Sequence, residues 1–475
     1  MTKISLIRSL LLILTLILFT GCDDDSETAT PLGVDAINLI FVVSPDLAND
    51  PLGDINLTTA NLNKQGLQRS LLMGSYLKEH VLGTTNPTSI SVLEPMTHLQ
   101  TVNNYPDMAA IGFIQQYALL NQITLLGTTA NSFSLNTAYA PGSTPIGVVE
   151  PDPYIPGCQG LDFDDANGNN LALVTGIIQA NAPGFYVFSA PWETTSALLA
   201  NINRIHGYNL DLPKTYKGPN HVYMISILPS GDAILLTFDS KLTPPATYPV
   251  LPSPVNACPC DQQDPFNITR IGGVNGVVIP ANSNVNQTVY LIRHAEAHPV
   301  DTFENGNYVG AGQWRALALP DALDGKIDPD QVYSIDPAQS FSYANYSFSY
   351  VRPSLTVLPY VIANNLPYKL VADFYIGSAT DTVEAKAASD FFFTGGNFTN
   401  QTLLVAWEHE HYPTLITELL KSYAGNDPPP TLTWDQTDYD TIWTVTLDAQ
   451  GNLTVDNALC EGIDSASLPA TAPQF

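Results

Sequence analysis

The chain has 475 residues, a formal net charge of −28, 45% hydrophobic residues and only 13% charged residues. Its length suffices for two or three domains with substantial cores, and its apolar content is too high for a disordered protein. Lysine and arginine together number 17 against 45 acidic residues. This negative balance disfavours binding to a nucleic-acid backbone, so we expect no nucleic-acid partner.

Residues 1–21 carry the signals of protein export. Lys3 and Arg8 precede a short apolar run over residues 10–19, which is too short to span a bilayer comfortably and is typical of a signal peptide. The run Phe19-Thr20-Gly21-Cys22 resembles a bacterial lipobox, in which the cysteine is lipidated and becomes the mature N-terminus.

These signals predict an exported bacterial lipoprotein, anchored to a membrane through lipidated Cys22 and facing the periplasm or the cell surface. Residues 1–21 are then the signal peptide that is removed, and residues 22–35 form a polar tether. Phe19 stands where a lipobox usually has leucine, so ordinary signal cleavage is one alternative. A retained N-terminal anchor helix is the other.

Beyond the lipobox the chain contains Cys158, Cys258, Cys260 and Cys460. An even number of cysteines in an exported protein favours disulfides. A metal site is the alternative, but Cys258 and Cys260 lack a companion pair at zinc-ligand spacing. We therefore predict disulfides that join each of these two residues to a distant partner, Cys158 or Cys460.

The pattern of predicted elements occurs twice along the chain. Strand-like runs over 37–43 and 288–292 each open a series that continues with a helix start and a strand ended by proline. The shared order predicts tandem α/β domains from an internal duplication, with chance similarity between α/β segments as the alternative. The predicted parts are a first domain over 36–241, a Pro-rich linker over 242–286, a second domain over 287–465 and a C-terminal tail over 466–475.

Basic and nucleophilic side chains follow the strands of the second series. A buried-strand pattern over 289–292 runs directly into Arg293 and His294, and another strand pattern precedes His409. Arg352 comes after a further strand and before a helical run. Ligands bind beyond the carboxyl ends of strands in open α/β sheets, so we expect these four side chains to share one crevice.

These motifs resemble those of the histidine phosphatase superfamily, the phosphoglycerate-mutase-like proteins. The Arg-His-Ala run at 293–295 matches the superfamily signature after its first strand. Trp407, His409 and Pro413 are similar to the second-histidine motif of some bacterial and fungal members. The resemblance covers about residues 287–460. It implies histidine-phosphatase-like three-layer α/β domains, a small-molecule phosphoester substrate, and neither a cofactor nor a metal.

The resemblance also implies a role for each residue of the crevice. His294 is the nucleophile that becomes phosphohistidine, and His409 stabilises the developing charge. Arg293 and Arg352 bind the phosphoryl oxygens, because a guanidinium can hold two oxygens of a group whose transfer depends on positioning and positive charge. A carboxylic acid must protonate the leaving alcohol, and the candidates are Asp373, Asp381, Glu408 and Glu410.

The first half has the same order of predicted elements but lacks the arginines and histidines. At the four functional positions it offers uncharged side chains, namely Val43, Ser44, Tyr105 and Trp192. We therefore predict a degenerate, non-catalytic domain that packs on, shapes or regulates the active one. Arg315, which has a counterpart in the first half, is expected to be a structural helix residue rather than a ligand.

Together these features predict an extracytoplasmic phosphohydrolase that cleaves phosphomonoesters through a phosphohistidine intermediate. A mutase would use the same residues, but phosphoglycerates are cytoplasmic. Another alternative is a non-catalytic surface or periplasmic binding lipoprotein, which the intact set of arginines and histidines argues against. The last is a zinc-dependent hydrolase, although Arg293 would repel its cation, with the ligands His294, His298, His409 and His411. Without a metal, His298 and His411 are expected at the rim.

Overall fold

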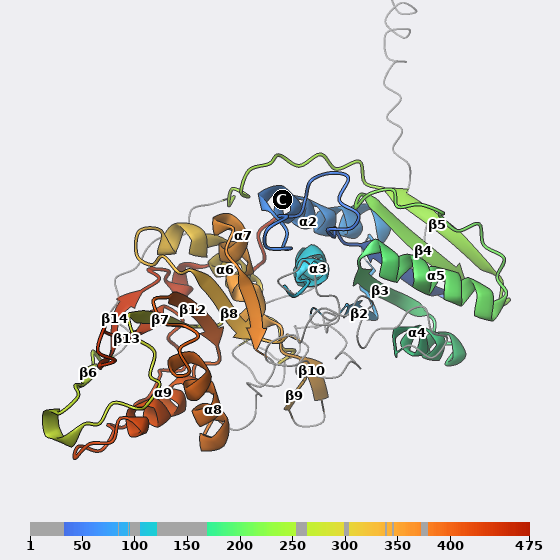
Figure 1. Cartoon of the computed structure of the whole chain (residues 1–475). Helices are drawn as coiled ribbons and strands as arrows, with labels where there is room; N and C mark the ends of the chain where they lie inside the picture. Colours follow the sequence, from blue (N-terminus) through green and yellow to red (C-terminus); the bar gives the residue numbers. More distant parts are fainter. Residues whose placement is uncertain are drawn as a thin grey trace, which may run out of the picture. The chain divides into compact units, whose positions relative to one another are not determined.

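Two large β-sheets with flanking helices make up most of the described chain (Figure 1). The computed structural model describes residues 33–83, 85–93, 95, 105–120, 169–252, 264–298, 304–337, 340–343, 346–371 and 379–475. These residues belong to one compact unit, Gly33–Phe475. The predicted signal peptide, most of the tether with Cys22, and Cys158, Cys258, Cys260 and Asp373 lie outside the described residues.

The first half builds a mixed sheet from short apolar strands. Within the described residues its order is β2-β3-β1-β4-β5, with β2, β3 and β1 parallel and β4 and β5 antiparallel. The strands are β1 (Ile37–Val43), β2 (Ser89–Val92), β3 (Gly184–Ala190), β4 (His221–Ile227) and β5 (Ala233–Asp239). The helices are α2 (Lys64–Tyr76), the π-helical turn η1 (Leu77–Val81), α3 (Ala109–Leu120), α4 (Asn169–Gln179) and α5 (Trp192–His206).

The second half builds a larger mixed sheet around the strands that precede the site residues. Its order within the described chain is β11-β8-β12-β7-β13-β14-β6, with the first four strands parallel and the last three antiparallel. The strands are β6 (Asn267–Arg270), β7 (Gln287–Arg293), β8 (Gln331–Ile335), β11 (Tyr368–Val371), β12 (Thr402–Trp407), β13 (Thr441–Leu447) and β14 (Leu453–Cys460). The helices are α6 (Gly310–Leu323), α7 (Arg352–Asn364), α8 (Thr382–Phe393) and α9 (His411–Ser422). Strands β9 (Ser340–Tyr343) and β10 (Tyr346–Ser349) form a separate ribbon, and η4 (Val274–Gly276) and η6 (Ser465–Ser467) are 3₁₀ turns.

The core of the second half lies between its sheet and the helices α8 and α9. Val289 and Leu291 of β7 and Leu415 and Leu419 of α9 belong to one fully buried cluster. The side chain of Ile292 points to the opposite face of the sheet, because neighbouring residues of a strand alternate, and it is also fully buried. Figure 1 shows α6 and α7 on the side of the sheet opposite α8 and α9. The sheet is therefore the middle layer of three, and the predicted α/β class is confirmed.

The two sheets share a strand pattern and a hydrogen-bond register. The order β2-β3-β1-β4-β5 corresponds to β8-β12-β7-β13-β14. In each sheet, the residue after the central strand donates its N–H to the last residue of the neighbouring strand. Ser44 donates to Ala190 at 3.0 Å, and His294 donates to Trp407 at 3.1 Å. Ser44 therefore takes the place that His294 has in the second half.

The positions of the helices show a further similarity between the two halves. They also correct the predicted match between Tyr105 and Arg352. Trp192 stands two residues after the end of β3, as His409 stands two residues after the end of β12. The helix α3 begins at Ala109, whereas α7 begins at Arg352. Counted from the helix start, Ala109 rather than Tyr105 holds the position of Arg352. The mismatch arises because proline alone does not fix where a helix begins.

A buried arginine braces the helix that follows the central strand in each half. Arg315 on α6 is fully buried and forms ion pairs with Glu296, at 2.8 Å, and with Glu461. Arg69 on α2 forms a buried ion pair with Asp54 at 2.7 Å. The predicted structural role of Arg315 is confirmed, because its guanidinium is committed to this internal network.

Parts of the predicted linker and tail belong to the folded unit. Within residues 242–286, β6 pairs with β14 and forms an edge of the second sheet, so this stretch is more than a connector. In the tail over 466–475, the Thr471 carbonyl accepts a hydrogen bond from Trp314 Nε1 at 2.8 Å. The second domain therefore begins earlier than predicted from the sequence, because the hydrophobic pattern of a four-residue edge strand is too short to detect.

Two remaining sequence expectations concern the cysteines and the membrane. Cys460, the last residue of β14, is disulfide-bonded. The predicted connectivity to Cys158, Cys258 and Cys260 falls on residues outside the described ones and stays a prediction. Among the helices that the structure describes, none is both long and apolar enough to cross a membrane.

Candidate active site

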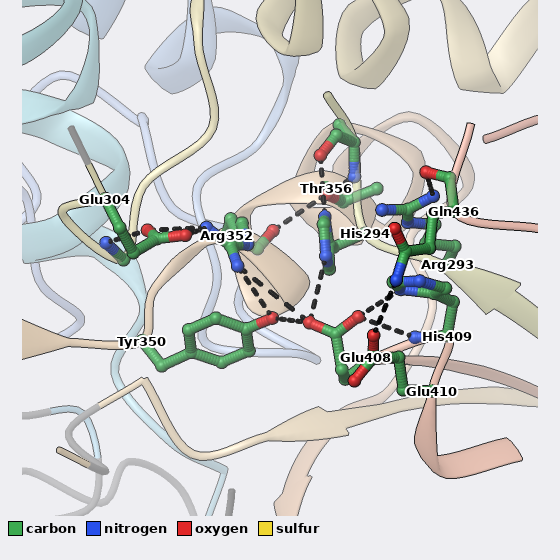
Figure 2. Close-up of polar contacts among 12 residues, drawn as sticks. Arg293, His294, Glu304, Tyr350, Arg352, Thr356, Glu408, His409, Glu410 and Gln436 are labelled. Atoms are coloured by element: carbon green, nitrogen blue, oxygen red, sulfur yellow. Dashed lines mark hydrogen bonds and ion pairs between the residues drawn. The ribbon is translucent and has the colours of Figure 1, made fainter. Parts of the chain in front are cut away.

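The four residues singled out by their motifs come together at the carboxyl ends of β7 and β12. Arg293 ends β7 and His294 follows it, while His409 lies two residues after the end of β12. Arg352 is the first residue of α7. The rings of His294 and His409 meet edge to face with their centroids 6.4 Å apart. Figure 2 shows this group, with Glu408 at its centre.

One side of the His294 ring is fixed by a hydrogen bond. Its Nδ1 lies 2.7 Å from the Ala295 carbonyl oxygen, which can only accept, so Nδ1 carries a proton. Burial lowers the pKa of His294 to about 4, although the neighbouring Glu408 carboxylate acts in the opposite direction. The imidazole is therefore neutral at neutral pH, with its nucleophilic nitrogen facing the site.

Glu408 lies between the two histidines. Its Oε2 is 3.1 Å from His294 Nε2 and accepts a hydrogen bond from the Tyr350 hydroxyl, while Oε1 contacts Nδ1 of His409. Arg352 Nη2 lies 3.9 Å from Oε2. Burial raises the pKa of Glu408, but the hydrogen bonds and charges of its neighbours outweigh burial and hold the pKa well below its usual range. An ionised carboxylate thus occupies the space among the cationic and imidazole groups.

Arg352 is also paired with a carboxylate. Its Nη1 donates to both oxygens of Glu304 at 2.7 Å, and Nη2 donates to the Tyr350 hydroxyl at 3.1 Å. Burial raises the pKa of Glu304, but the charge and hydrogen bonds of Arg352 lower it by more. The backbone of Arg352 is fixed as well, because its N–H donates to the Gly306 carbonyl at 3.0 Å. The loop that carries Glu304 therefore positions Arg352.

Arg293 is turned toward the chain segment after α9. Its Nη1 donates to the carbonyl oxygens of Gln436 at 2.6 Å and Asp438 at 3.1 Å. Its guanidinium carbon lies 3.8 Å above the centroid of the Tyr439 ring. The Arg293 Nε is buried and has no hydrogen-bond partner among the described residues. In this arrangement the backbone carbonyls hold Nη1 of the guanidinium.

The structure separates the four candidate proton donors. Glu408 contacts both histidines. Glu410 is exposed and reaches Gln436 Nε2 at 3.4 Å. Asp381 caps α8 by accepting hydrogen bonds from two backbone N–H groups of its first turn. Asp373 lies outside the described residues. Glu408 is therefore the candidate that the geometry brings to the reacting nitrogen.

Three further side chains of the site are not among the residues predicted from the sequence. Glu304 follows His294 by ten residues in a stretch without regular hydrophobic spacing, so nothing in the sequence marks it. Tyr439 precedes β13 and likewise has no signal. Tyr350 lies two residues before Arg352, and a tyrosine so close to a predicted phosphate-binding arginine is a signal that could have found it.

The residues that could hold a metal differ from the predicted four histidines. Among the described residues, the ligand atoms of His294, Glu408 and His409 lie within 4.8 Å of one another. His411 is buried against Trp407, with ring centroids 4.7 Å apart, so its predicted place at the rim is wrong. His411 is the first residue of α9, which begins directly after the site residues. Because this helix packs on the sheet, the side chain of its first residue is buried in the core.

Comparison with known proteins gives matches to solved structures only. No family model and no curated protein matches the chain. A putative phosphohistidine phosphatase SixA from Agrobacterium tumefaciens matches with 19% identity and a TM-score of 0.21, covering 34% of this chain and 93% of that one. The putative SixA from Nakamurella multipartitia matches with 16% identity and a TM-score of 0.23, covering 41% and 96%.

Phosphoserine phosphatase from Entamoeba histolytica, in complex with 3-phosphoglyceric acid, matches with 15% identity and a TM-score of 0.25, covering 36% of this chain and 96% of that one. These structural neighbours are histidine phosphatase family members. At such TM-scores the matches carry no argument about function, so the functional proposal depends on the site itself.

Proposed function

We propose that this protein is a phosphohydrolase that cleaves phosphomonoesters through a phosphohistidine intermediate on His294. The observation that carries the proposal is the state of this imidazole. Nδ1 is committed to the Ala295 carbonyl, so Nε2 faces the side on which Glu408, His409 and Arg352 also lie (Figure 2). A neutral imidazole with a fixed tautomer is the form that can attack phosphorus.

The reaction follows from the groups around Nε2. In the first step Nε2 forms a bond to phosphorus, the bond from phosphorus to the alcohol oxygen breaks, and the carboxylic acid of Glu408 gives that oxygen a proton. In the second step water attacks phosphorus, Glu408 takes back a proton from the water, and neutral His294 leaves. Arg352 and Arg293 supply positive charge to the phosphoryl oxygens, and His409 donates a hydrogen bond to them.

Substrate binding requires the two site carboxylates to give way. Glu304 now holds Arg352, and Glu408 lies 3.1 Å from the attacking nitrogen. Two like charges about 4 Å apart repel each other by about 4 kcal/mol at an effective dielectric constant of 20. A phosphoryl group therefore forces Glu408 to rotate away or to take up a proton. Proton uptake would load the acid that the first step needs, so substrate entry and acid formation are coupled.

The site chemistry is shared by phosphatases and mutases, and the sequence favours a phosphatase. We propose that the protein is exported, lipidated at Cys22 and anchored to a membrane facing the periplasm or the cell surface, where small-molecule phosphoesters would be hydrolysed. The basic residues before a short apolar run and the lipobox-like segment support this location.

We propose that the first half is a degenerate duplicate that supports the second. Its strand order and register match the second half, but Ser44 and Trp192 stand where the histidines would be. Gln115 on α3 donates to Asn307 at 3.0 Å and accepts from it at 3.3 Å, and both side chains are buried. Asn307 follows Gly306, whose carbonyl holds the backbone of Arg352. The first half therefore holds the loop that positions an active-site cation.

Assay of the purified protein against a panel of phosphomonoesters tests the function. We expect release of inorganic phosphate by the wild type and by the matched control Ser44→Ala, and loss of four or more orders of magnitude in His294→Ala by analogy with other lost nucleophiles. A wild type that hydrolyses no ester but retains a phosphorylated ligand would favour the non-catalytic binding lipoprotein.

A further inference from the structure

We propose that His294, Glu408 and His409 form a binding site for a divalent transition-metal ion, best suited to zinc, which competes with phosphate for the same space. Metal binding is inferred from the geometry of the three side chains alone. The consequence, inhibition of turnover, rests on the proposed function, because only a catalytic His294 would be disabled by the ion.

The three side chains form a compact donor set. Their ligand atoms all lie within 4.8 Å of one another. Zinc binds imidazole nitrogen and carboxylate oxygen at about 2.0–2.1 Å in tetrahedral geometry, so two ligands of one ion are about 3.3 Å apart. Side-chain shifts of up to about 1.5 Å therefore close the set around one ion. Two imidazoles and one carboxylate are a donor combination that zinc and other first-row metals accept.

His294 and Glu408 face each other across the space that the ion would fill. Nε2 of His294 lies 3.1 Å from Oε2 of Glu408, and that oxygen also accepts from the Tyr350 hydroxyl. Either a proton or a metal ion can lie between the nitrogen and the carboxylate oxygen. The separation is close to the edge, about 3.3 Å, of a tetrahedron with bonds of 2.0 Å.

The surroundings support a metal ligand at His294. A metal-bound histidine usually donates its other ring nitrogen to a carbonyl or carboxylate, which fixes the ring. Here the Ala295 carbonyl supplies that contact at 2.7 Å. His409 brings a further buried nitrogen, because its Nε2 has no hydrogen-bond partner among the described residues. The first coordination position beyond the three ligands would remain open to water.

The positive charge of the arginines is largely compensated where the ion would lie. Glu304 neutralises Arg352 through a pair of 2.7 Å contacts. Arg293 points to backbone carbonyls and to the face of Tyr439. The carboxylate of Glu408 is then the negative charge that faces the ion, and the remaining charge of Arg293 is directed at carbonyl oxygens and an aromatic ring. Phosphate needs the opposite state, with both arginines released and Glu408 displaced, so the two ligands exclude each other.

Titration calorimetry with Zn²⁺ on metal-free purified protein tests the site, with Co²⁺ absorption as a second measurement of the coordinated ligands. We expect uptake of one Zn²⁺ and a loss of affinity of about tenfold or more in Glu408→Gln, since even outer-shell changes cost about that much. Two matched controls, His298→Gln and His80→Gln, should leave the affinity unchanged. His80 is an exposed imidazole beside Glu79, and His298 belongs to the four-histidine set.

The kinetic measurement uses the same protein with a phosphomonoester. Zn²⁺ should raise the apparent KM without lowering kcat, and EDTA should preserve or raise turnover. Absence of Zn²⁺ uptake by an active phosphatase would overturn the metal site and leave the proposed function intact. Uptake that depends on Glu408 in a protein without phosphatase activity would support the site and remove the proposed function. Zinc-dependent activation would overturn the inhibitory role.

Discussion

Replacement of Glu408 by glutamine separates its two proposed roles, acid and occupant of the phosphate space. Glutamine has nearly the same shape, and its single oxygen can keep the acceptor contact to either Tyr350 or His409, but it cannot donate a proton to a leaving alcohol. General acid catalysis contributes about two to four orders of magnitude, or about 2.7–5.4 kcal/mol. We therefore expect kcat/KM for alkyl phosphates to fall about 10²- to 10⁴-fold.

The same variant should behave differently with activated esters and with vanadate. An aryl phosphate whose phenolate leaves without protonation should lose about tenfold or less. Removal of a carboxylate that repels an oxyanion by about 4 kcal/mol should tighten vanadate binding. In the wild type this binding takes up a proton at Glu408, so vanadate affinity should fall as the pH rises, and Glu408→Gln should abolish that dependence.

The assay compares an alkyl and an aryl ester in the wild type, Glu408→Gln and the matched control Glu410→Gln. Glu410 is the exposed neighbouring candidate, and its variant should show no dependence on the leaving group. Equal losses on both esters in Glu408→Gln, or a selective loss in Glu410→Gln, would refute the assignment of the acid.

Three further outcomes follow from the structure. Because burial lowers the pKa of His294 to about 4, the imidazole should stay unprotonated until the pH approaches 4. In a pH–rate profile, protonation of this group should therefore lower kcat/KM only near pH 4. Arg315→Met leaves the Glu461 carboxyl group buried without its ion pair. Because burial already raises the pKa of Glu461 to about 8, the group can take up a proton, and the loss in free energy of unfolding should reach at most about 3–5 kcal/mol and should grow as the pH rises. An unchanged midpoint in denaturant titrations would contradict the structural role of Arg315. Gln115→Ala removes the buried contact to Asn307 and should lower kcat/KM by about tenfold, while Gln115→Asn should recover part of it; an effect on stability alone would show that the pair merely packs.

The strand-end residues were predictable from the sequence for a physical reason. A buried apolar run that ends in Arg293-His294 fixes where those side chains emerge, because parallel strands end at one edge of the sheet. The same argument applies to His409 after β12. Repetition of the element pattern also suggested two similar sheets, and the observed strand orders agree with each other.

The carboxylates that balance the site could not be predicted in the same way. Glu304 reaches Arg352 from a loop whose sequence has no periodic pattern, and only the folded chain brings the two together. Glu408 was one of four candidate acids, and its sequence position alone did not distinguish it from Glu410. The misplaced rim residue His411 shows the same limit, because a one- or two-residue difference beyond a strand decides between the site, the core and the solvent.

The central claim, a phosphohistidine on His294, is tested most directly by trapping the intermediate. Purified protein would be mixed with a ³²P-labelled phosphomonoester, quenched in alkali within the first turnover and digested for mass spectrometry. We predict a base-stable, acid-labile phosphoryl group on the peptide that contains His294, and its absence in His294→Ala. Turnover without any labelled protein, or a label on another residue, would contradict the proposed mechanism.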